Sequence, residues 1–389
     1  MSAPRVIHLT TTDMSLDWLL RPQLEAFLAH GYDVVGMSAP GPHVAALEAS
    51  GIRHVAVPSL TRSMSPARDL RAFGDLRRAF RRLAPDIVHT HNPKPGVLGR
   101  LAARSAGVPA VVNTVHGLYA LPEDRAAKKA VVYGLERIAA GCSDAELLQN
   151  EEDLPVLRRL GVPHRKLTVL GNGIDLQRFR PEAAAPGSRE RLRREWAVGE
   201  QTTVIGVVGR LVWEKGYRAV FEAARLLAEL DCRIVVVGPD EPDKVGAVGA
   251  ADRAAAEESG VRFLGHRDDM VDLYGAFDVY ALASHREGFP RSAMEASAMG
   301  LPVVASDIRG CRQVVRPRVT GTLFPVDDAA ALADALRPLI GDDVRRRRMG
   351  DAARARAREH FDDRDVVATT LRTYDWLLAR VPAAATASA

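Results

Sequence analysis

The chain has 389 residues, 47% of them hydrophobic and 26% charged, and this length and balance predict two globular domains rather than one. No stretch approaches 18 consecutive apolar residues, which argues against a transmembrane helix. Cys142, Cys232 and Cys311 are scattered without Cys-x-x-Cys spacing, which excludes a zinc ribbon and favours reduced thiols in the cytoplasm.

The net charge of +4 is distributed unevenly along the chain. Residues 60–104 hold ten Lys or Arg and three Asp, a balance of +7. A basic face of this kind suits a phosphate-bearing partner or an anionic membrane surface. The alternative is a set of solvated helices whose arginines merely lie near one another.

The first half of the chain alternates short apolar, β-branched runs with longer amphipathic stretches. Such strands, separated by helices, are typical of a parallel sheet that is covered on both faces. Strands are expected at 5–10, 33–39, 53–59, 86–91, 110–117, 144–150 and 167–173. Helices are expected at about 17–30, 42–50, 66–83, 95–106 and 124–141.

The motif RPEAAAPGS at 180–188 interrupts this pattern and is expected to be an interdomain linker. We therefore predict an N-terminal Rossmann-like domain over 1–186 and a C-terminal one over 187–363. The last helix is expected to pack back on the first domain, followed by a disordered tail at 381–389. In the second domain, strands are expected at 203–210, 232–238, 261–266, 278–284 and 302–306, and the last helix at about 364–380.

The predicted fold class is α/β, with two doubly wound domains that face each other across a cleft. In open α/β sheets, ligands bind at the carboxyl ends of the strands. Two facing domains would place the active site between them. The loops that carry the candidate residues below all follow a predicted strand, so we expect them to line that cleft.

Two glutamates lie eight positions apart in HREGFPRSAMEASAMG, at 285–300. Glu287 is expected in the loop after a strand, and Glu295 near the second turn of the helix that follows. Pro290 suits the start of this helix and Gly300 its end. Both carboxylates could therefore face one small ligand. The alternative is that both are solvated and stabilise the helix through its dipole.

A second group of charged residues lies in GRLVWEKG, at 209–216. Arg210 and Lys215 follow a strand and precede a helix, which combines two cations with oriented backbone N–H groups. This combination predicts a diphosphate site, although two surface cations in a loop would look the same. The chain has no GxxxxGK[ST] motif and no GxGxxG after its first strand, which argues against a nucleoside triphosphatase and a nicotinamide-dinucleotide enzyme.

These two groups, together with GNGID at 171–175, resemble the family 4 retaining glycosyltransferases of the GT-B fold. The resemblance covers nearly the whole chain. It implies that Arg210 and Lys215 neutralise the diphosphate of a nucleotide-sugar donor. It also implies that Glu295 binds the ribose hydroxyls and Glu287 the hydroxyls of the donor sugar. Further donor contacts are implied for the backbone of Gly288 and Phe289, the loop of His266 and Arg267, and Asn172 with Gly173.

His116, in TVHG, matches the family histidine that reaches the transferred sugar from the N-terminal domain. The resemblance therefore adds His116 to the expected catalytic group. Without the family match, a core histidine with satisfied hydrogen bonds would be the favoured interpretation. His89 and His91 alternate on one strand face and could both bind a metal ion, but no third ligand is evident.

The segment after the first strand departs from the family pattern. Many members carry a Gly-Gly turn there, and this chain has TTTDMSLDWLLRPQ. This segment and HTHNPKPGVLGRLAAR resemble bacterial transferases that extend glycans on a polyprenyl-diphosphate lipid. Asp13, His91 and Lys94 are the expected acceptor contacts. Lys94 is one of only six lysines, and we hypothesise that it contacts an acceptor phosphate.

We therefore predict a retaining glycosyltransferase of cell-surface polysaccharide synthesis. The expected donor is a UDP-sugar such as a UDP-N-acetylhexosamine, and the expected acceptor is a hydroxyl of a polyprenyl-diphosphate-linked glycan. No cofactor, metal ion or nucleic acid is expected. The expected location is the cytoplasm, with peripheral association at the inner face of the plasma membrane. The alternatives are a soluble natural-product or small-molecule acceptor, a nucleotide-sugar epimerase and a non-catalytic sugar-nucleotide-binding protein.

Overall fold

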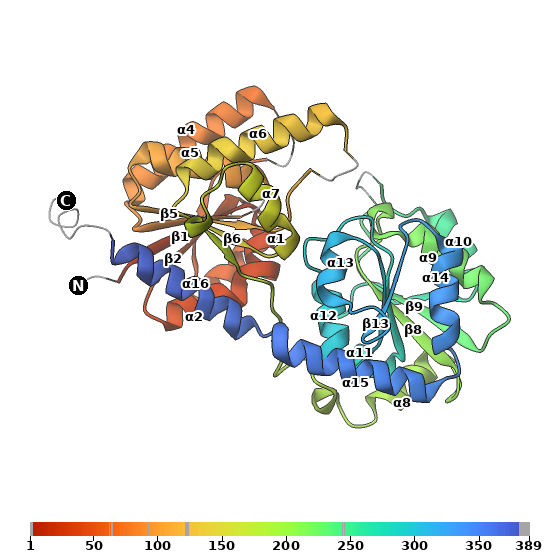
Figure 1. The fold of residues 1–389 in the computed structure, drawn as a ribbon. Coiled ribbons are helices and arrows are strands. Elements are labelled where there is room, and N and C mark those ends of the chain that lie inside the picture. Colours follow the sequence, from red (N-terminus) through yellow and green to blue (C-terminus); the bar gives the residue numbers. More distant parts are fainter. Residues whose placement is uncertain are drawn as a thin grey trace. The chain divides into compact units, whose positions relative to one another are not determined.

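The computed structural model describes residues 3–61, 63, 65–91, 93–120, 124–242, 244 and 246–380. The chain forms two compact α/β units (Figure 1). Unit 1 holds the chain up to Gly171 and again from Arg364, and unit 2 runs from Asn172 to Asp363. Among the described helices, none combines the length and apolar character that crossing a bilayer requires. The expected tail at 381–389 lies outside the described residues.

Unit 1 is built on a parallel sheet with the strand order β3-β2-β1-β4-β5-β6-β7. The sequence predicts all seven strands, and β4 is buried along its whole length, as expected for a strand covered on both faces. Neighbouring residues of β1 enter different cores, Val6 on one face and Ile7 on the other. The strands are β1 Arg5–Thr12, β2 Asp33–Ala39, β3 Arg53–Ala56, β4 Ile87–His91, β5 Ala110–Val115, β6 Ala145–Leu148 and β7 Leu167–Val169.

Helices cover both faces of this sheet (Figure 1). Phe80 of α4 packs in the core on one face, whereas Phe27 of α2 and Tyr374 of α16 pack in the core on the other. The helix α16 thus brings the chain back to unit 1. The helices are α1 Asp13–Ser15, the π-helix η1 Leu16–Leu20, α2 Arg21–Ala29, α3 Val44–Ala49, α4 Pro66–Leu83, α5 Pro93–Ala106, α6 Ala126–Cys142, η2 Glu151–Asp153, α7 Leu154–Arg159, η3 His164–Lys166 and α16 Asp363–Leu378.

Unit 2 has a six-stranded parallel sheet with the order β10-β9-β8-β11-β12-β13. Its last strand, β13, was not predicted, because it has four residues, begins with a glycine and lies at the edge of the sheet. The strands are β8 Thr203–Val208, β9 Cys232–Val237, β10 Val261–Phe263, β11 Val279–Leu282, β12 Val303–Ser306 and β13 Gly321–Phe324. The helices are η4 Pro181–Ala183, α8 Ser188–Glu195, η5 Trp213–Lys215, α9 Tyr217–Leu226, α10 Ala250–Glu258, α11 Met270–Ala276, α12 Arg291–Ala298, α13 Arg309–Val314, α14 Ala329–Leu336, η6 Arg337–Leu339 and α15 Asp343–His360.

The boundary between the units lies at Gly171, earlier than the expected boundary at 186. Residues after Gly171 pack on unit 2 instead of forming a linker. Ile174 is fully buried there, and its N–H donates to the Phe361 carbonyl at 2.9 Å. The Ala185 N–H donates to the Asp272 carboxylate at 2.8 Å. The proline- and alanine-rich composition suggested a linker, but these backbone contacts place the segment on the second sheet's domain.

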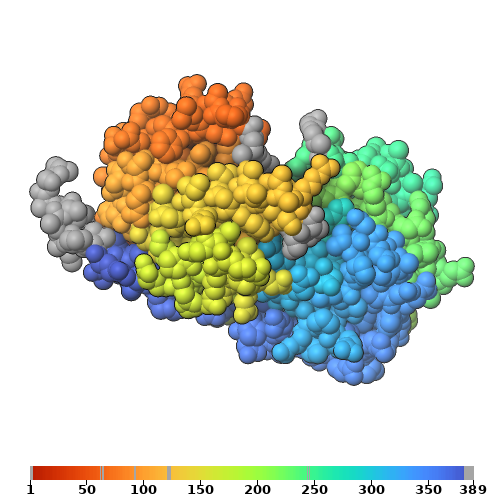
Figure 2. All heavy atoms as spheres, turned by 45° about the horizontal axis from the view of Figure 1, so that its top comes forward, coloured from red at the N-terminus to blue at the C-terminus, as the bar shows by residue number. Residues whose placement is uncertain are grey.

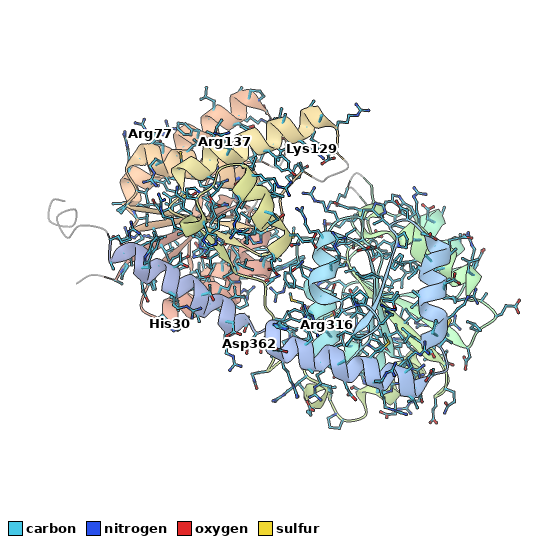
Figure 3. All side chains as sticks on the ribbon, in the orientation of Figure 1. His30, Arg77, Lys129, Arg137, Arg316 and Asp362 are labelled. Carbon is cyan, nitrogen blue, oxygen red and sulfur yellow. The ribbon has the colours of Figure 1, made fainter. Side chains whose placement is uncertain are left out.

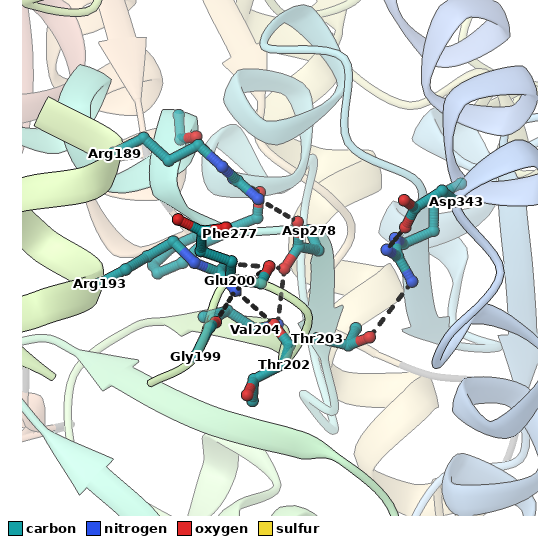
Figure 4. A network of polar contacts seen from close by, with 12 residues as sticks. Arg189, Arg193, Gly199, Glu200, Thr202, Thr203, Val204, Phe277, Asp278 and Asp343 are labelled. Atoms are coloured by element: carbon teal, nitrogen blue, oxygen red, sulfur yellow. Dashed lines mark hydrogen bonds and ion pairs between the residues drawn. The ribbon is translucent and has the colours of Figure 1, made fainter. Parts of the chain in front are cut away.

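An ion-pair network holds the beginnings of β8 and β11 together (Figure 4). The Asp278 carboxylate, just before β11, accepts from Arg189 at 2.6 Å and from Arg193 at 3.0 Å. It also accepts the Val204 N–H of β8 at 2.7 Å, and the two arginines lower the pKa of Asp278 against the opposing effect of its burial. The network therefore fixes the two strands whose other ends carry the candidate site.

Candidate functional site

The strands β8 and β11 mark the topological switch point of unit 2. From β8 the chain proceeds to β9 and β10 on one side, and β11 then pairs with β8 on the other side. Ligands of open α/β sheets bind at the carboxyl edge beside such a point. The loops at 209–216 and 283–290 follow these two strands, so the predicted diphosphate loop and the predicted glutamate loop are neighbours.

A direct backbone contact joins the two loops. The His285 N–H donates to the Glu214 carbonyl at 2.9 Å. Gly216 has a φ of +74°, and a Cβ atom there would lie 1.9 Å from the Ala283 carbonyl oxygen. Only glycine combines this left-handed backbone with so close an approach. Gly216 therefore lets the first loop pass against the second, and this fixes where the adjacent Lys215 lies.

Lys215 and Glu287 form an ion pair, with 2.6 Å between Nζ and Oε1. The Ser284 hydroxyl donates to the same carboxylate oxygen at 2.7 Å. A Cβ atom at Gly310 would lie 2.5 Å from the Glu287 carbonyl oxygen, so α13 backs the loop closely. The structure thus brings together two of the predicted residues and adds Ser284, which was not predicted because a single serine in a loop gives no sequence pattern.

Arg210 lies in the same loop as Lys215 but pairs with another carboxylate. Its Nη1 atom is 3.0 Å from Glu241 Oε2, and the Lys244 Nζ atom lies 3.1 Å from the same oxygen. The Arg210 side chain remains about one-third exposed, at 33%. Glu241 follows β9 and was not predicted as a partner of the site. The guanidinium is therefore held in place by a neighbouring strand's loop and keeps part of its surface open to a ligand.

Glu295 lies in α12, which begins at Arg291 beside Pro290 and is followed by Gly300 at a φ of +80°. The Tyr274 hydroxyl of α11 donates to Glu295 Oε2 at 2.9 Å. Burial raises the pKa of Glu295, and the positive charge of Arg291 opposes this effect. A carboxylate in such surroundings gains from further hydroxyl donors, which a ribose diol would supply.

Two further segments that were predicted to contact the donor also touch each other. The Asn172 Nδ2 atom donates to the Phe289 carbonyl at 3.3 Å, and Asn172 Oδ1 accepts the Gly173 N–H at 3.0 Å. The segment of Asn172 and Gly173 therefore lies against the loop of Gly288 and Phe289, within unit 2. The family resemblance implies that both segments contact the donor, and it gives no reason for their contact with each other.

Arg267 has partners of its own. Its guanidinium donates to both carboxylate oxygens of Asp269, at 2.8 and 2.6 Å, and to Glu195 at 3.3 Å. The hydrogen bonds with Asp269 raise the pKa of Arg267 and lower that of Asp269. His266 beside it is exposed. A contact of this loop with the base of a nucleotide stays a prediction.

In unit 1, His116 is partly exposed and lies at one end of a row of histidines whose other members are buried. Its Nε2 atom is 3.1 Å from His91 Nδ1, and His91 Nε2 is 3.0 Å from His8 Nδ1. Burial lowers the pKa of His8 to about 3 and that of His116 to about 4, so both are neutral at pH 7.

The expectation that His89 and His91 lack a third metal ligand was wrong, because His8 approaches both from β1. The nitrogens of these three histidines that face one another lie within 4.8 Å. However, the His89 and His91 rings stack, with centroids 4.3 Å apart, and each nitrogen already has a hydrogen-bond partner in the protein. Stacked rings do not direct their nitrogens at one ion, so the geometry favours hydrogen bonding over metal binding.

The predicted acceptor residues Asp13 and Lys94 have partners within unit 1. The buried Asp13 carboxylate accepts the N–H groups of Met14 at 2.9 Å and His43 at 2.7 Å. Lys94 donates to the Ser63 carbonyl at 2.7 Å and pairs with Asp69. The structure gives both side chains local roles, and their contact with an acceptor stays a prediction.

Comparison with known proteins places this geometry in a family. The model for glycosyl transferases group 1 matches residues 188–356, and the model for glycosyltransferase family 4 matches 20–178. The chain is similar to a UDP-Gal:α-D-GlcNAc-diphosphoundecaprenol α-1,3-galactosyltransferase of Escherichia coli, with 33% identity over 75% of this chain and 76% of that protein. It is also similar to a D-inositol 3-phosphate glycosyltransferase of Xylanimonas cellulosilytica, with 34% identity over 77% of this chain and 73% of that protein.

Among solved structures, HepE from Anabaena in complex with UDP and glucose superposes with a TM-score of 0.77. That match has 19% identity and covers 96% of this chain and 100% of HepE, so it supports the fold. The predicted family and fold class are thereby confirmed. The chain belongs to the group 1 glycosyltransferases of family 4, and its two parallel-sheet units are the Rossmann-like domains of the GT-B fold.

Proposed function

We propose that the protein is a retaining glycosyltransferase that uses a UDP-sugar and transfers the sugar to a hydroxyl of a polyprenyl-diphosphate-linked glycan. The observation that carries the proposal is the Lys215–Glu287 pair at the switch point of unit 2, with Arg210 in the same loop. The E. coli relative is named for a UDP-sugar donor and a diphosphoundecaprenol-linked acceptor, and HepE was solved with UDP and glucose.

In this proposal, Arg210 and Lys215 bind the diphosphate, while the backbone N–H groups of Gly288 and Phe289 bind the donor beside them. Glu287 accepts hydrogen bonds from hydroxyls of the donor sugar, and Ser284 and Lys215 hold its carboxylate in position. The half-buried Glu295 binds the ribose, with Tyr274 fixing one of its oxygens.

The reaction breaks the bond between the anomeric carbon and the diphosphate oxygen. Negative charge then builds on the diphosphate and positive charge on the sugar ring. Arg210 and Lys215 stabilise the departing diphosphate, and because they are already in place, little reorganisation is needed in the transition state. The acceptor hydroxyl forms the new bond on the face that the diphosphate leaves, and its proton passes to a departing phosphate oxygen. Attack on that face retains the anomeric configuration.

The proposal is tested first by a thermal-shift screen of UDP, GDP and ADP and their common sugar conjugates. A ligand that binds the folded state alone raises the melting temperature. Stabilisation by the uridine series only, followed by release of UDP when a diphosphate-linked glycan is added, supports the proposal. Binding of the nucleotide sugar without transfer to any acceptor would instead support a non-catalytic sugar-nucleotide-binding protein.

The D-inositol 3-phosphate relative favours a second acceptor class, a soluble phosphorylated polyol. It is as similar to this chain as the E. coli relative is, so identity alone does not choose between them. Parallel assays with a polyprenyl-diphosphate-linked GlcNAc and with inositol 3-phosphate separate the two. Transfer to the soluble acceptor alone would overturn the lipid-linked acceptor and leave the donor site as proposed.

Replacing Glu295 with glutamine is expected to abolish recognition of the ribose hydroxyls. The wild type should bind UDP about tenfold more tightly than 2′-deoxy- or 3′-deoxy-UDP, because a hydrogen bond to a carboxylate contributes about 1.5–3 kcal/mol. Glu295→Gln should bind the three ligands with similar affinity in calorimetric titrations. Glu222→Gln, on the exposed face of α9, is the matched control. If Glu295→Gln kept the wild-type ratio of affinities for UDP and its deoxy analogues, Glu295 would not be the residue that binds the ribose hydroxyls.

A lipid-linked acceptor requires the protein to work at a membrane surface, and the helix α6 of unit 1 offers a suitable face (Figures 2 and 3). Val131, Leu135 and Ile138 recur at helical spacing and are 62%, 38% and 60% exposed. Lys129 and Arg137 are on the other side of this helix (Figure 3), whereas Lys128 lies nearly one turn before Val131, on the side of the apolar residues, with its side chain 43% exposed. Exposed apolar residues on a helix that also carries cations are typical of a helix that lies in an anionic lipid interface.

Val131→Ser with Ile138→Ser is expected to weaken binding to phosphatidylglycerol vesicles about tenfold, because two apolar side chains no longer enter the interface. Sedimentation with vesicles measures the effect, and raising the salt concentration should also weaken binding. Leu226→Ser with Val344→Ser, two exposed apolar residues of unit 2, is the control. Equal binding by both double variants would contradict the assignment of α6.

A further inference from the structure

A continuous chain of hydrogen bonds runs through the core of unit 1 and ends at His116. At its far end, the Thr114 hydroxyl lies 2.7 Å from His89 Nε2. The other nitrogen of His89, Nδ1, lies 2.5 Å from the Tyr374 hydroxyl, which is 3.3 Å from His8 Nε2. Tyr374 belongs to α16 and is fully buried. The roles proposed above use neither this tyrosine nor His8 and His89.

The hydrogen bonds continue from His8 through His91 to His116. His8 Nδ1 pairs with His91 Nε2, and His91 Nδ1 pairs with His116 Nε2, at 3.0 and 3.1 Å. The Gln149 side chain is a further hydrogen-bond partner of His116, and it opposes the lowering of the His116 pKa by burial. His8 and His91 are only 1% and 2% exposed, so water does not replace these partners. His116 is the one histidine of the row that is partly exposed.

A neutral imidazole has one N–H donor and one acceptor nitrogen, and a hydroxyl has one donor. Burial keeps the histidines neutral at pH 7 and raises the pKa of the Tyr374 hydroxyl, which therefore keeps its proton. If every hydrogen bond is made and every N–H and O–H proton is used, each group must accept from the neighbour on one side and donate to the neighbour on the other. Only two proton arrangements meet this condition, and each gives the four histidines the same tautomer.

In one arrangement the Thr114 hydroxyl donates to His89 and each histidine carries its proton on Nδ1, and in the other each histidine carries it on Nε2. We propose that Tyr374 of α16 is a positioning residue that, through His8 and His91, holds His116 in one tautomer, the same as that of His89. The consequence for transfer rests on the proposed glycosyltransferase function and on the role of His116 at the donor sugar that the family resemblance implies. The common tautomer itself depends only on the hydrogen bonds described here.

Tyr374→Phe tests the proposal, because it removes the joint between His89 and His8 and preserves the ring that packs on Phe27 and Tyr32. Tyr32→Phe is the matched control, since the Tyr32 hydroxyl also contacts α16, at Asp375, but lies outside the chain of hydrogen bonds. Long-range ¹H–¹⁵N NMR of the full chain, with labelled histidine, reports which ring nitrogen of each histidine is protonated.

In the wild type and in Tyr32→Phe, His8, His89, His91 and His116 should all be protonated on the same ring nitrogen, either all on Nδ1 or all on Nε2. In Tyr374→Phe, His116 should show a mixture of tautomers while the melting temperature stays close to that of the wild type. The kcat for transfer should fall about fivefold at an unchanged KM for the donor, as expected for the loss of one neutral hydrogen bond.

Three results would overturn the proposal. The first is a wild type in which His116 and His89 are protonated on different ring nitrogens, or in which either of them exchanges between tautomers. The second is a Tyr374→Phe protein whose His116 tautomer is unchanged. The third is one equivalent of a transition metal in the purified wild type that His8→Gln abolishes, because the three buried histidines would then be metal ligands. The NMR result decides the tautomer even if the protein transfers no sugar, so it is independent of the proposed function.

Discussion

Replacing Lys215 with methionine is expected to reduce the kcat of glycosyl transfer by at least about a hundredfold. The ammonium group is the cation that Glu287 holds at the switch point, 2.6 Å from the carboxylate. In the proposed reaction it faces the diphosphate on which negative charge develops, and removing one such preplaced donor raises the barrier by about 3 kcal/mol. Methionine keeps the length of the side chain, so the loop geometry that Gly216 provides should survive.

The measurement is the initial rate of UDP release with saturating donor and acceptor, alongside calorimetric binding of UDP. Arg225→Met removes an exposed cation of α9 and should leave the rate unchanged. A cycle with Glu287→Gln separates two roles of Lys215. If Lys215 only positions Glu287, the double variant will be no slower than Glu287→Gln. If Lys215 acts on the diphosphate, the double variant will be slower, and a Lys215→Met enzyme within threefold of the wild type would refute the site.

Lowering the pH from 7.5 to 5 is expected to unfold unit 1 while unit 2 stays folded. His8, His89 and His91 are buried in unit 1, and burial lowers the pKa of each below the ordinary 6.5. As the pH falls below 6.5, the histidines therefore bind protons in the unfolded chain before they do so in the folded protein. The free energy of unfolding decreases until the pH reaches the folded-state pKa, which is about 3 for His8. The contribution of these neutral histidines to the stability of unit 1 is fully present above pH 6.5 and is lost as the pH falls below it.

Each histidine removes about 1.4 kcal/mol of unfolding free energy per pH unit in this window. The three together remove about 4 kcal/mol per pH unit, against a typical domain stability of about 5–15 kcal/mol. Hydrogen exchange measured at pH 7.5, 6.5, 5.5 and 5.0 follows the two units separately, and unit 2 is the internal control because it contains none of these histidines. Protection in unit 1 that persists unchanged at pH 5 would contradict the buried neutral row.

Much of the fold and of the donor site follows from local pattern. Nearly continuous apolar strands between amphipathic helices predict a parallel sheet, and a residue just after such a strand must lie at its carboxyl edge. This reasoning predicts that Lys215 and Glu287 lie at the same edge of the sheet, and the pairing of β8 with β11 in the structure then explains why the two side chains meet.

The partners of the predicted residues were harder to foresee, because they come from distant parts of the chain. Tyr374 is 285 residues from His89, and Glu241 is 31 residues from Arg210. No periodicity relates such pairs, and only the packed fold brings them together. Lys94 is a further example. Its position after a strand suggested a cation available to an acceptor phosphate, yet in the packed unit 1 it forms an ion pair with Asp69.

The return of α16 to unit 1 has a consequence for the order in which a ribosome completes the protein. Translation releases the seven strands of the first sheet, then all of unit 2, and only afterwards the residues from Arg364 onward. Unit 2 can therefore finish folding as a continuous stretch of chain while unit 1 still has an open face where Tyr374 and Leu377 belong. The domain whose synthesis begins first is thus the last to complete its core. Until then, His8 and His89 lack the Tyr374 hydroxyl that contacts both of them in the folded protein.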